Sequence, residues 1–313
     1  MLGGKTVAVV VPAYRESALI ADTLRSIPEF VDRVYVVDDA SDDGTADAAR
    51  ALADGRVEVV RHERNSGVGG AIVTGYKRAL DEAVDVTCVM AADNQMDPGD
   101  LERLVRAVAA GDVDYAKANR LVSGEAWRVM PRSRYLGNAM LSLLTKIASG
   151  YWHVADSQSG YTAIALPMLE RLELDRIYPR YGFPNDMLVH LNVWNARVRD
   201  FPSRPIYGVG ERSGIKIRSV VPRISWLLLK GFLWRLREKY VIRDFHPLVF
   251  FYVLGFLMTL AGFVLGIVET ALRIAGNRVS VATVVLVALL LIAGSQLTLF
   301  AMWFDMESNK DLR

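Results

Sequence analysis

Three polar side chains follow one short apolar run, in a spacing that suits metal-assisted chemistry. Residues 84–90 are mostly apolar and predict a buried strand, and Asp93, Gln95 and Asp97 follow shortly after it. Asp93 and Gln95 are two residues apart, so in an extended segment they point to the same side. Two oxygen ligands on one side suit Mg²⁺ or Mn²⁺ shared with a diphosphate. For Asp97 we favour another interpretation, the N-cap of a helix that begins at Pro98.

These side chains must be positioned by strands and helices that alternate through the first half of the chain. Strands are expected at residues 7–11, 31–37, 57–60, 84–90 and 113–118, and helices at residues 17–27, 45–53, 67–82 and 97–110. Alternation at this spacing predicts βαβ units and an α/β fold with a mostly parallel sheet. Such sheets bind ligands at the carboxyl ends of their strands, where residues 93–97 lie.

Polar groups also follow the first two expected strands. The segment after the first strand is Pro12, Ala13, Tyr14, Arg15 and Glu16, and Asp38 and Asp39 end the second. Carboxylates at this edge can accept hydrogen bonds from a base N–H and from ribose hydroxyls, as in a nucleotide pocket. Asp42 and Asp43 fit a turn and a helix cap, but no cap requires both Asp38 and Asp39.

A glycine-rich segment, Asn65-Ser66-Gly67-Val68-Gly69-Gly70-Ala71, follows the third expected strand. It is not a P-loop, because no Gly-Lys-Ser/Thr follows, and it is in the wrong place for a dinucleotide fingerprint, which follows the first strand. Its glycines would permit close approach of the backbone, either to a ligand or to the neighbouring strand.

Four motifs occur together in one order: Pro12-Ala13-x-x-Glu16, Val36-Val37-Asp38-Asp39-x-Ser41-x-Asp43-Gly44-Thr45, Asn65-x-Gly67-x-Gly69-Gly70-Ala71-x-x-x-Gly75 and Asp93-x-Gln95. As a set they resemble the family 2 inverting glycosyltransferases of GT-A fold, and within them the polyprenyl- and dolichyl-phosphate mannose and glucose synthases. The resemblance implies a UDP- or GDP-sugar donor, a divalent cation held by Asp93 and Gln95, and a polyprenyl phosphate acceptor. The chain departs from the family at Ala91, where the first Asp of Asp-x-Asp is usual, and at Arg15, where Asn is usual.

The resemblance also implies roles for individual residues. Those expected to bind the nucleotide sugar are Pro12, Ala13, Tyr14, Glu16, Asp38, Asp39, Gly67, Gly70 and Asp93, with Arg212 and Lys216 in a lid. Those expected to bind the acceptor phosphate are Arg120, Arg128, Arg132, Arg134 and Asn138, unless these arginines form only a solvated basic loop. Arginine suits this task because its planar fork binds two phosphate oxygens at once.

Three residues are expected to be catalytic by the same resemblance: Asp156, Asp93 and Asp186. Asp156 is favoured over Asp186, because an acidic residue in the first turn of a helix is also explained by the helix dipole. A phosphate monoester acceptor is already anionic near neutral pH, so Asp156 would then orient the sugar or stabilise positive charge on its ring. A hydroxyl acceptor would instead require Asp156 to act as a general base.

Composition narrows the class of protein. The 313 residues are 52% hydrophobic and carry a net charge of only +2, which disfavours nucleic acid as a partner. The single cysteine, Cys88, lies in an apolar run and is expected in the core, and no Cys/His zinc spacing occurs. The apolar run at residues 7–11 is too short for the core of a signal peptide.

Two long uncharged runs in the C-terminal third predict a membrane anchor. Residues 247–268 and 280–304 are each long enough to span a bilayer, and residues 223–240 mix Trp, Leu and Phe with Lys and Arg, as in an interfacial amphipathic helix. The basic residues before the first span are Lys230, Arg235, Arg237, Lys239 and Arg243. They outnumber Arg273 and Arg278 between the spans, which favours cytoplasmic placement of both termini and of the catalytic domain.

The expected organisation is therefore a catalytic domain at residues 1–218, an interfacial segment at 219–245 and a transmembrane hairpin at 246–313. The expected function is transfer of a hexose from a nucleotide sugar to a polyprenyl phosphate. Two alternatives stay open: a non-catalytic scaffold or export subunit with a degenerate transferase domain, which Ala91 suggests, and a transferase with a non-lipid acceptor. The two spans could also pack with copies of themselves in a homo-oligomer.

Overall fold

The computed structural model describes residues 1–52, 54–121, 132–204, 206 and 217–313. The chain divides into two compact units, one formed by Met1–Leu233 with Asp311–Arg313 and the other by Trp234–Lys310. The division falls inside residues 219–245, the segment expected to lie at the membrane surface. The last three residues of the chain belong to the first unit.

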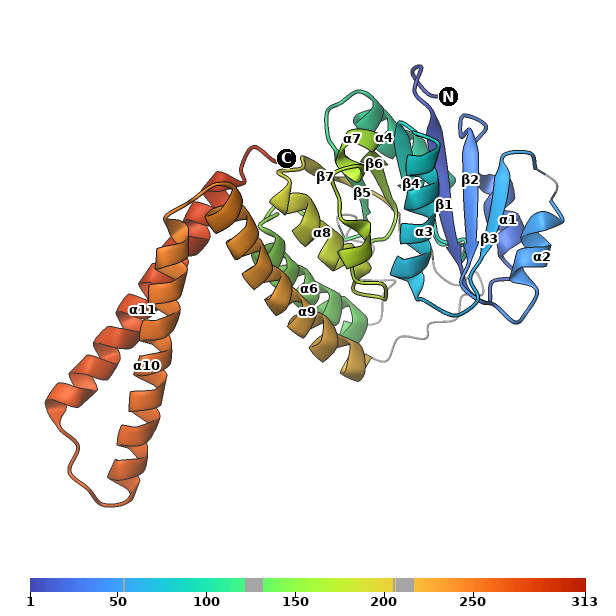
Figure 1. The fold of residues 1–313 in the computed structure, drawn as a ribbon. Helices are drawn as coiled ribbons and strands as arrows, with labels where there is room; N and C mark the ends of the chain where they lie inside the picture. Colours follow the sequence, from blue (N-terminus) through green and yellow to red (C-terminus); the bar gives the residue numbers. More distant parts are fainter. Residues whose placement is uncertain (53, 122–131, 205, 207–216) are drawn as a thin grey trace. The chain divides into compact units, whose positions relative to one another are not determined.

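The first unit is built on a seven-stranded sheet with the strand order β3-β2-β1-β4-β6-β5-β7 (Figure 1). Its strands are β1 (Val7–Ala13), β2 (Arg33–Asp38), β3 (Val57–Arg61), β4 (Val86–Val89), β5 (Tyr115–Asn119), β6 (Thr162–Ala165) and β7 (Val198–Pro202). Neighbouring strands are parallel except at β6, which is antiparallel to both β4 and β5. The predicted mostly parallel α/β sheet is confirmed.

Helices cover both faces of this sheet. One face is covered by α1 (Ile20–Ser26), α2 (Thr45–Arg50) and α4 (Pro98–Ala109), and the other by α3 (Val68–Asp81), α7 (Leu166–Leu169), the 3₁₀ helix η1 (Leu174–Arg176) and α8 (Phe183–Val193). Side chains alternate along a strand, so Val9 of β1 enters the first core and Val10 the second. The helix expected to begin at residue 17 begins instead at Ile20, after a turn closed by Leu19 N and Glu16 O.

Two further helices complete the first unit. The helix α6 (Arg132–Ser149) packs on α8, and most of α9 (Ile217–Arg237) also belongs to this unit. Gly182, at the start of α8, has Leu227 of α9 directly over it: a Cβ on the glycine would lie 2.6 Å from Leu227 Cδ2. The middle of α9 is therefore packed against the first unit.

Strand order brings three strand ends to one edge. β1 lies between β2 and β4, and the chain changes its direction across the sheet between β3 and β4. The register pairs Ala13 of β1 with Asp38 of β2, and Val10 of β1 with Val89 of β4. The carboxyl ends of these strands therefore meet at a topological switch point, where open α/β sheets bind ligands.

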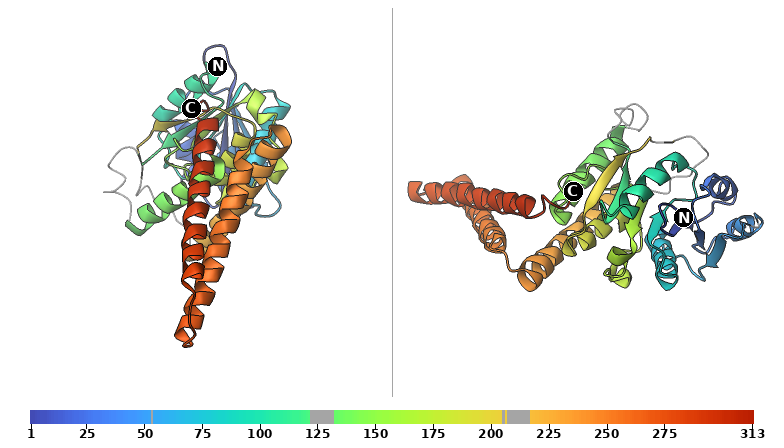
Figure 2. Two further views of the ribbon diagram at one scale, coloured as in Figure 1. Left: turned by 90° about the vertical axis from the view of Figure 1, so that its left-hand side faces the viewer. Right: turned by 90° about the horizontal axis from the view of Figure 1, so that it is seen from above.

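The second unit contains two long apolar helices, α10 (Leu248–Ile274) and α11 (Val281–Ser308), preceded by the π-helix η2 (Glu238–Arg243). Figures 1 and 2 show α10 and α11 side by side. Both are long and apolar enough to cross a bilayer, and most of their large apolar side chains are exposed. The predicted apolar helices are confirmed, and both extend beyond the predicted runs.

A buried ion pair joins the segment before α10 to the end of α11. Arg235 donates from Nη1 and Nη2 to the two carboxylate oxygens of Asp305, over 2.9 and 2.8 Å, and neither side chain is exposed. The hydroxyl of Tyr240 also donates to Asp305 Oδ1, over 2.6 Å. Within this unit, η2 is thereby tied to the C-terminal turn of the second apolar helix.

Candidate functional site

Asp39, directly after β2, anchors the loop that leads into α3. Its Oδ1 accepts hydrogen bonds from Ser66 N and His62 Nδ1, each over 2.8 Å, and its Oδ2 accepts one from Gly67 N, also over 2.8 Å. An ionised carboxylate only accepts, so His62 must carry a hydrogen on Nδ1. This buried carboxylate therefore fixes the shape of the glycine-rich loop.

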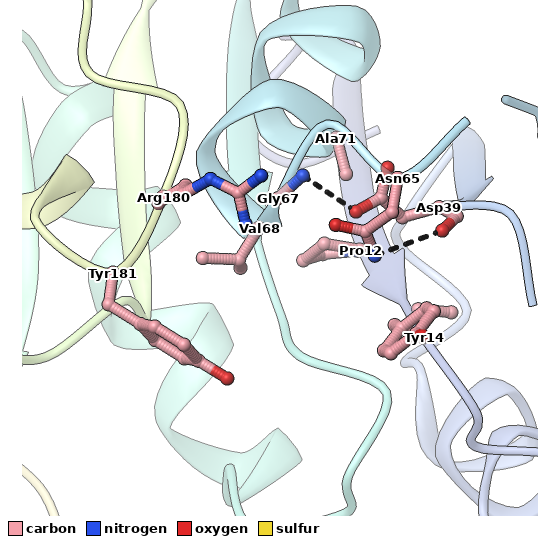
Figure 3. A pocket seen from close by; sticks show the side chains of 10 residues that line it. Pro12, Tyr14, Asp39, Asn65, Gly67, Val68, Ala71, Arg180 and Tyr181 are labelled. Atoms are coloured by element: carbon pink, nitrogen blue, oxygen red, sulfur yellow. Dashed lines mark hydrogen bonds between the residues drawn. The ribbon is translucent and has the colours of Figure 1, made fainter. Parts of the chain in front are cut away.

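An open pocket of about 280 Å³ lies beside Asp39 (Figure 3). Five residues expected to bind the nucleotide sugar line it: Pro12, Ala13, Tyr14, Asp39 and Gly67. Its far side is formed by Arg180 and Tyr181, which come from the connector between η1 and α8. The pocket thus combines the ends of β1 and β2 with the start of α3 and a distant segment of the chain.

Asp38 does not line this pocket. Its carboxylate is fully buried, with Oδ1 accepting a hydrogen bond from Ser41 N over 3.1 Å and Oδ2 3.3 Å from Arg61 Nε. Of the two adjacent carboxylates, Asp39 alone borders the cavity, whereas Asp38 holds the turn that follows β2.

The glycines of the loop make room for protein backbone. A Cβ on Gly67 would lie 2.6 Å from Pro179 O, and a Cβ on Gly69 would lie 2.6 Å from Tyr178 O. Gly70 does not line the pocket, and its N–H donates to Pro179 O over 3.0 Å. At Gly67, Gly69 and Gly70 the close approach is therefore to residues 178–181, and it brings Arg180 and Tyr181 to the pocket. At Gly75 it is to the neighbouring strand, because a Cβ there would lie 2.2 Å from Val10 Cγ1 of β1.

Asp186 holds the same connector from the other side. It lies in the first turn of α8, and its Oδ2 accepts a hydrogen bond from Tyr178 N over 2.8 Å. Burial raises the pKa of Asp186 to about 6 and lowers the pKa of His190, whose Nε2 is 3.7 Å from the same oxygen, to about 4. His190 is therefore neutral near pH 7, and the two side chains form no ion pair.

Asp93 and Gln95 lie between β4 and α4 in a turn, not in an extended segment. Asn94 between them has a left-handed backbone with φ 55°, and Gln95 N donates to Asp93 Oδ1 over 3.1 Å. The same-side arrangement expected of an extended segment therefore does not apply. Asp97 accepts a hydrogen bond from Gly99 N over 2.9 Å, which confirms the predicted N-cap of α4.

The charges near Asp93 fit a hard cation. Burial and the negative charge of Asp93 raise the pKa of Glu16, which follows β1, to about 7. A divalent cation would relieve this repulsion between carboxylates, and their oxygens suit Mg²⁺ or Mn²⁺. Across the described residues, no three His, Cys, Asp or Glu side chains gather as a metal site. Diphosphate oxygens would therefore have to complete the coordination.

Asp156 lies in the loop before β6 and is fully buried. Arg120, which follows β5, donates to it from Nε over 2.8 Å and from Nη2 over 3.3 Å, and its backbone N–H donates over 3.2 Å. Burial opposes ionisation of Asp156, but the guanidinium of Arg120 outweighs it and holds the pKa below its usual range. Asp156 is therefore an ionised carboxylate with both oxygens engaged.

Two further charged side chains, the buried Lys117 and the partly buried Asp200, support this loop. Lys117 Nζ donates to the backbone oxygen of Asp156, and Asp200 accepts from Asn119 Nδ2 over 2.9 Å and from Ala155 N over 2.7 Å. Burial lowers the pKa of Lys117 and raises the pKa of Asp200. Together these bonds tie the loop before β6 to β5 and β7.

The structure does not describe the side chains of several predicted residues. Arg128, Arg212 and Lys216 lie outside the described residues. Arg132, Arg134 and Asn138 belong to α6, whose backbone is described there without these side chains. Of the predicted acceptor-phosphate group, only the side chain of Arg120 is described, and the group as a whole stays a prediction.

Arg180 and Tyr181 were not predicted from the sequence. They stand in Tyr178-Pro179-Arg180-Tyr181-Gly182, directly before α8. Polar and aromatic residues before a helix are common, and nothing in their local pattern shows that the chain returns here to the glycine-rich loop. The close contacts at Gly67 and Gly69 and the hydrogen bond from Gly70 N to Pro179 O reveal it.

Comparison with known proteins agrees with this architecture. Residues 8–172, more than half of the chain, match the profile of glycosyl transferase family 2. The UDP-N-acetylglucosamine–dolichyl-phosphate N-acetylglucosaminyltransferase of Methanococcus voltae is 27% identical over 221 residues, covering 66% of this chain and 88% of the relative. The polyprenol monophosphomannose synthase of Mycolicibacterium smegmatis is 30% identical over 250 residues, covering 73% and 89%.

A solved structure shares the fold. The glucosyl-3-phosphoglycerate synthase of Mycobacterium tuberculosis, crystallised with Mn²⁺, UDP and glucosyl-3-phosphoglycerate, superposes with a TM-score of 0.56. It is 20% identical and covers 74% of this chain and 80% of its own, so the likeness concerns the GT-A fold alone. The chain belongs to glycosyl transferase family 2, and it is a GT-A glycosyltransferase related to enzymes that act on polyprenyl and dolichyl phosphates.

Proposed function

We propose that this glycosyltransferase moves a hexose from a UDP- or GDP-sugar to a polyprenyl phosphate, with inversion at the anomeric carbon. The observation that carries the proposal is the pocket at the carboxyl edge of the sheet, bordered by Asp39 and the glycine-rich loop, in a chain with two long apolar helices. The relatives named above, one a dolichyl-phosphate N-acetylglucosaminyltransferase and the other a polyprenol monophosphomannose synthase, support the acceptor class.

The reaction needs an acceptor oxygen, a leaving group and stabilisation of the charge that develops. A phosphate oxygen of the acceptor attacks the anomeric carbon, the carbon–oxygen bond to the nucleoside diphosphate breaks, and its electron pair leaves with the diphosphate. The acceptor oxygen is already anionic near neutral pH, so it requires no general base. Asp156, ionised and held by Arg120, suits orientation of the sugar or stabilisation of positive charge at its ring.

Asp93 and Gln95 are the residues that would hold the Mg²⁺ or Mn²⁺, with Glu16 close enough for its pKa to respond to Asp93. The chemistry that such a cation supplies is neutralisation of negative charge on the departing diphosphate. Ala91 leaves this chain without the usual first Asp, so we infer that Glu16 and Asp93 share the carboxylate role at this edge.

The acceptor keeps its hydrocarbon tail in the bilayer, so the site must work at the membrane surface. Exposed Trp226, Leu229 and Leu233 on α9 support contact of this helix with lipid. Leu312 O accepts a hydrogen bond from Val198 N of β7 over 3.0 Å, which supports both termini lying on the catalytic side of the membrane. The excess of basic residues before α10 favours the cytoplasm as that side.

A donor screen tests the proposal. The full-length protein in detergent is incubated with polyprenyl phosphate and a panel of UDP- and GDP-sugars, and mass spectrometry reads the lipid product. Formation of a polyprenyl-phosphate sugar is expected with one class of donor. Transfer only to a water-soluble acceptor would support the non-lipid alternative, and no transfer from any donor would support a non-catalytic scaffold.

A further inference from the structure

The strand β7 lies at one edge of the sheet, where backbone groups have no neighbouring strand on the outer side (Figure 1). Arg197 directs its carbonyl to β5, since Arg197 O accepts a hydrogen bond from Tyr115 N over 3.0 Å. Successive residues of a strand direct their backbone groups to opposite sides, so the N–H and the carbonyl of Val198 point to the outer edge. Both of these groups nevertheless have partners, which come from two distant segments of the chain.

The first partner is a residue that follows the second apolar helix. Val198 N donates a hydrogen bond to Leu312 O over 3.0 Å, and the side chain of Leu312 packs against the second core. Leu312 is half-buried, whereas Asp311 and Arg313 on either side of it are exposed. Leu312 is therefore the residue by which residues 311–313 are attached to the first unit.

The second partner is His153, in the segment that leads to Asp156. His153 Nε2 is 2.7 Å from Val198 O, and a carbonyl oxygen only accepts, so the ring carries a hydrogen on Nε2. Burial lowers the pKa of His153, so the ring is neutral near pH 7 and this hydrogen bond does not depend on a charge. The two outward backbone groups of Val198 are thus bonded to Leu312 and to His153.

Alternate residues of the segment before Asp156 are bonded to alternate residues at the edge of the sheet. The three bonds join Tyr151 Oη to Ala196 O, His153 Nε2 to Val198 O, and Ala155 N to Asp200 Oδ2, each over 2.7 Å. Asp156 follows Ala155 directly, so its position depends on the position of β7 as well as on Arg120.

We propose that Leu312 and His153 are positioning residues for Asp156. Leu312 fixes Val198 from the outer side of the sheet, His153 binds the same residue, and the segment that ends at Asp156 is held against β7 as a result. The residues that follow α11 therefore contribute to the transfer step through β7. The inference rests on the proposed function, because it assigns positioning residues to that same site.

A comparison of turnover with nucleotide binding tests this role in the full-length protein in detergent. Leu312→Asp places a charge against the second core and should release residues 311–313 from β7. We expect kcat, with the donor and the lipid acceptor found in the donor screen, to fall about tenfold or more, because a small displacement of a site residue is costly for catalysis. Binding of UDP and GDP, measured by calorimetry with MgCl₂ present, should stay unchanged, because the pocket is lined from residues 12–71 and 180–181.

Two variants are matched controls. Leu312→Met keeps an apolar side chain of similar volume and should retain turnover near that of the wild type. Asp311→Ala changes the exposed neighbouring residue and should change neither turnover nor binding. Unchanged kcat in Leu312→Asp would overturn the proposal. A parallel loss of kcat and nucleotide affinity would overturn it as well, by indicating a general loss of stability.

The double variant of Leu312→Asp with His153→Phe tests whether the two residues act through Val198. His153→Phe keeps a ring beside Tyr151 but removes the donor to Val198 O. Because both residues position the same segment, the loss of kcat in the double variant should be little larger than in the more affected single variant. Losses that multiply would show two independent effects and would overturn the shared role of Val198.

Hydrogen exchange, which requires no turnover, distinguishes this inference from the proposed function. In Leu312→Asp the backbone amides of residues 151–156 should exchange at least about fivefold faster than in the wild type, the scale of one lost hydrogen bond. Unchanged exchange there would overturn the inference whatever sugar is transferred. Faster exchange, combined with no transfer by the wild type, would overturn the proposed function and leave the attachment of this segment to Leu312 standing.

Discussion

Arg120 holds the buried carboxylate of Asp156 through both of its oxygens, with Nε 2.8 Å from Oδ2 and Nη2 3.3 Å from Oδ1. A carboxylate bound in this way stays ionised and has little freedom to accept a proton. It is also a poor general base, which agrees with an acceptor that is already anionic. The pair links the end of β5 to the loop before β6, so it also holds the candidate site together.

Removing Arg120 should destabilise the protein more than removing a surface arginine. Arg120→Met leaves Asp156 charged and buried, a loss of about 3–5 kcal/mol for a broken buried pair. Arg197→Met is the matched control, because Arg197 pairs with Asp114 at the surface, where such pairs contribute about 0–1 kcal/mol. Thermal unfolding in detergent measures both, and equal shifts in melting temperature would contradict the role assigned to Arg120.

The glycine-rich loop should tolerate no side chain at Gly69. In Gly69→Ala the new Cβ would lie 2.6 Å from Tyr178 O and 2.9 Å from Phe183 Cβ, so residues 178–183 must move away from the pocket. We expect a loss of nucleotide affinity of at least about tenfold with a lower melting temperature. Gly55→Ala, where the Cβ meets nothing within 4 Å, is the control and should change neither. Unchanged nucleotide affinity in Gly69→Ala would show that the position of residues 178–183 does not affect binding in the pocket.

Asp186→Asn should stabilise the protein near neutral pH. Burial raises the pKa of Asp186 to about 6, so the folded state favours the protonated form. The protonated carboxyl of Asp186 stabilises the folded state fully below about pH 4, the pKa of an aspartate in the unfolded chain. This stabilisation, about 2–3 kcal/mol in the free energy of unfolding, is lost as the pH rises to about 6. Asparagine can still accept from Tyr178 N, so the variant avoids this loss.

The measurement is the difference in melting temperature between Asp186→Asn and the wild type from pH 4 to pH 8. It should grow up to about pH 6 and then stay constant. Turnover should be largely retained, because Asp186 contacts the backbone of the connector. Abolished turnover with an unchanged pH profile would instead identify Asp186 as a catalytic residue.

The sheet edge that carries the pocket could be predicted because its signals are local. Apolar runs that end at Pro12, Asp38 and Met90 mark the carboxyl ends of buried parallel strands. The strand β7 escaped prediction because Arg199 and Asp200 interrupt its apolar residues at the edge of the sheet. A strand of this kind has no continuous apolar run, and its five residues are too few for an alternation of apolar and polar side chains to be recognised.

The parts of the site that escaped prediction depend on contacts between distant segments. The sequence could suggest two uses for the glycines at 67–70, but not that the backbone of Tyr178 and Pro179 would lie against them. Asp38 and Asp39 look alike in the sequence, and only the turn at Ser41 and the loop at Gly67 assign them different partners. The sequence could therefore predict that both acidic residues lie at the end of a strand, but not which of them borders the pocket.

Asp93 and Asp97 should differ in what their loss affects. Asp93→Ala is expected to lower turnover by orders of magnitude, because Asp93 is a candidate cation ligand. Asp97→Ala removes the cap on Gly99 N and should cost about 1 kcal/mol of stability with turnover retained. Rates with and without a chelator, together with melting temperatures, distinguish the two. Full activity in excess chelator would exclude a required divalent cation.

The topology of the membrane hairpin can be tested with single introduced thiols. Cys88, the only native cysteine, is fully buried, and burial raises the pKa of its thiol, so it should not react with a maleimide. Asn277→Cys places an exposed thiol between α10 and α11, and Asp311→Cys places one after α11. A membrane-impermeant maleimide applied to intact cells should label Asn277→Cys alone, and Asp311→Cys should react only after lysis.

The expected pattern follows from two observations. Two apolar helices that both span the bilayer would return the chain to the side on which it began, and Leu312 O accepts a hydrogen bond from Val198 N of the catalytic unit, so we expect residue 311 and this unit on one side. The basic residues before α10 then favour the cytoplasm for that side. Labelling of Asp311→Cys alone on intact cells would reverse the orientation and put the catalytic unit outside. Labelling of both positions, with the impermeance of the reagent verified, would show that α10 and α11 do not form a spanning hairpin.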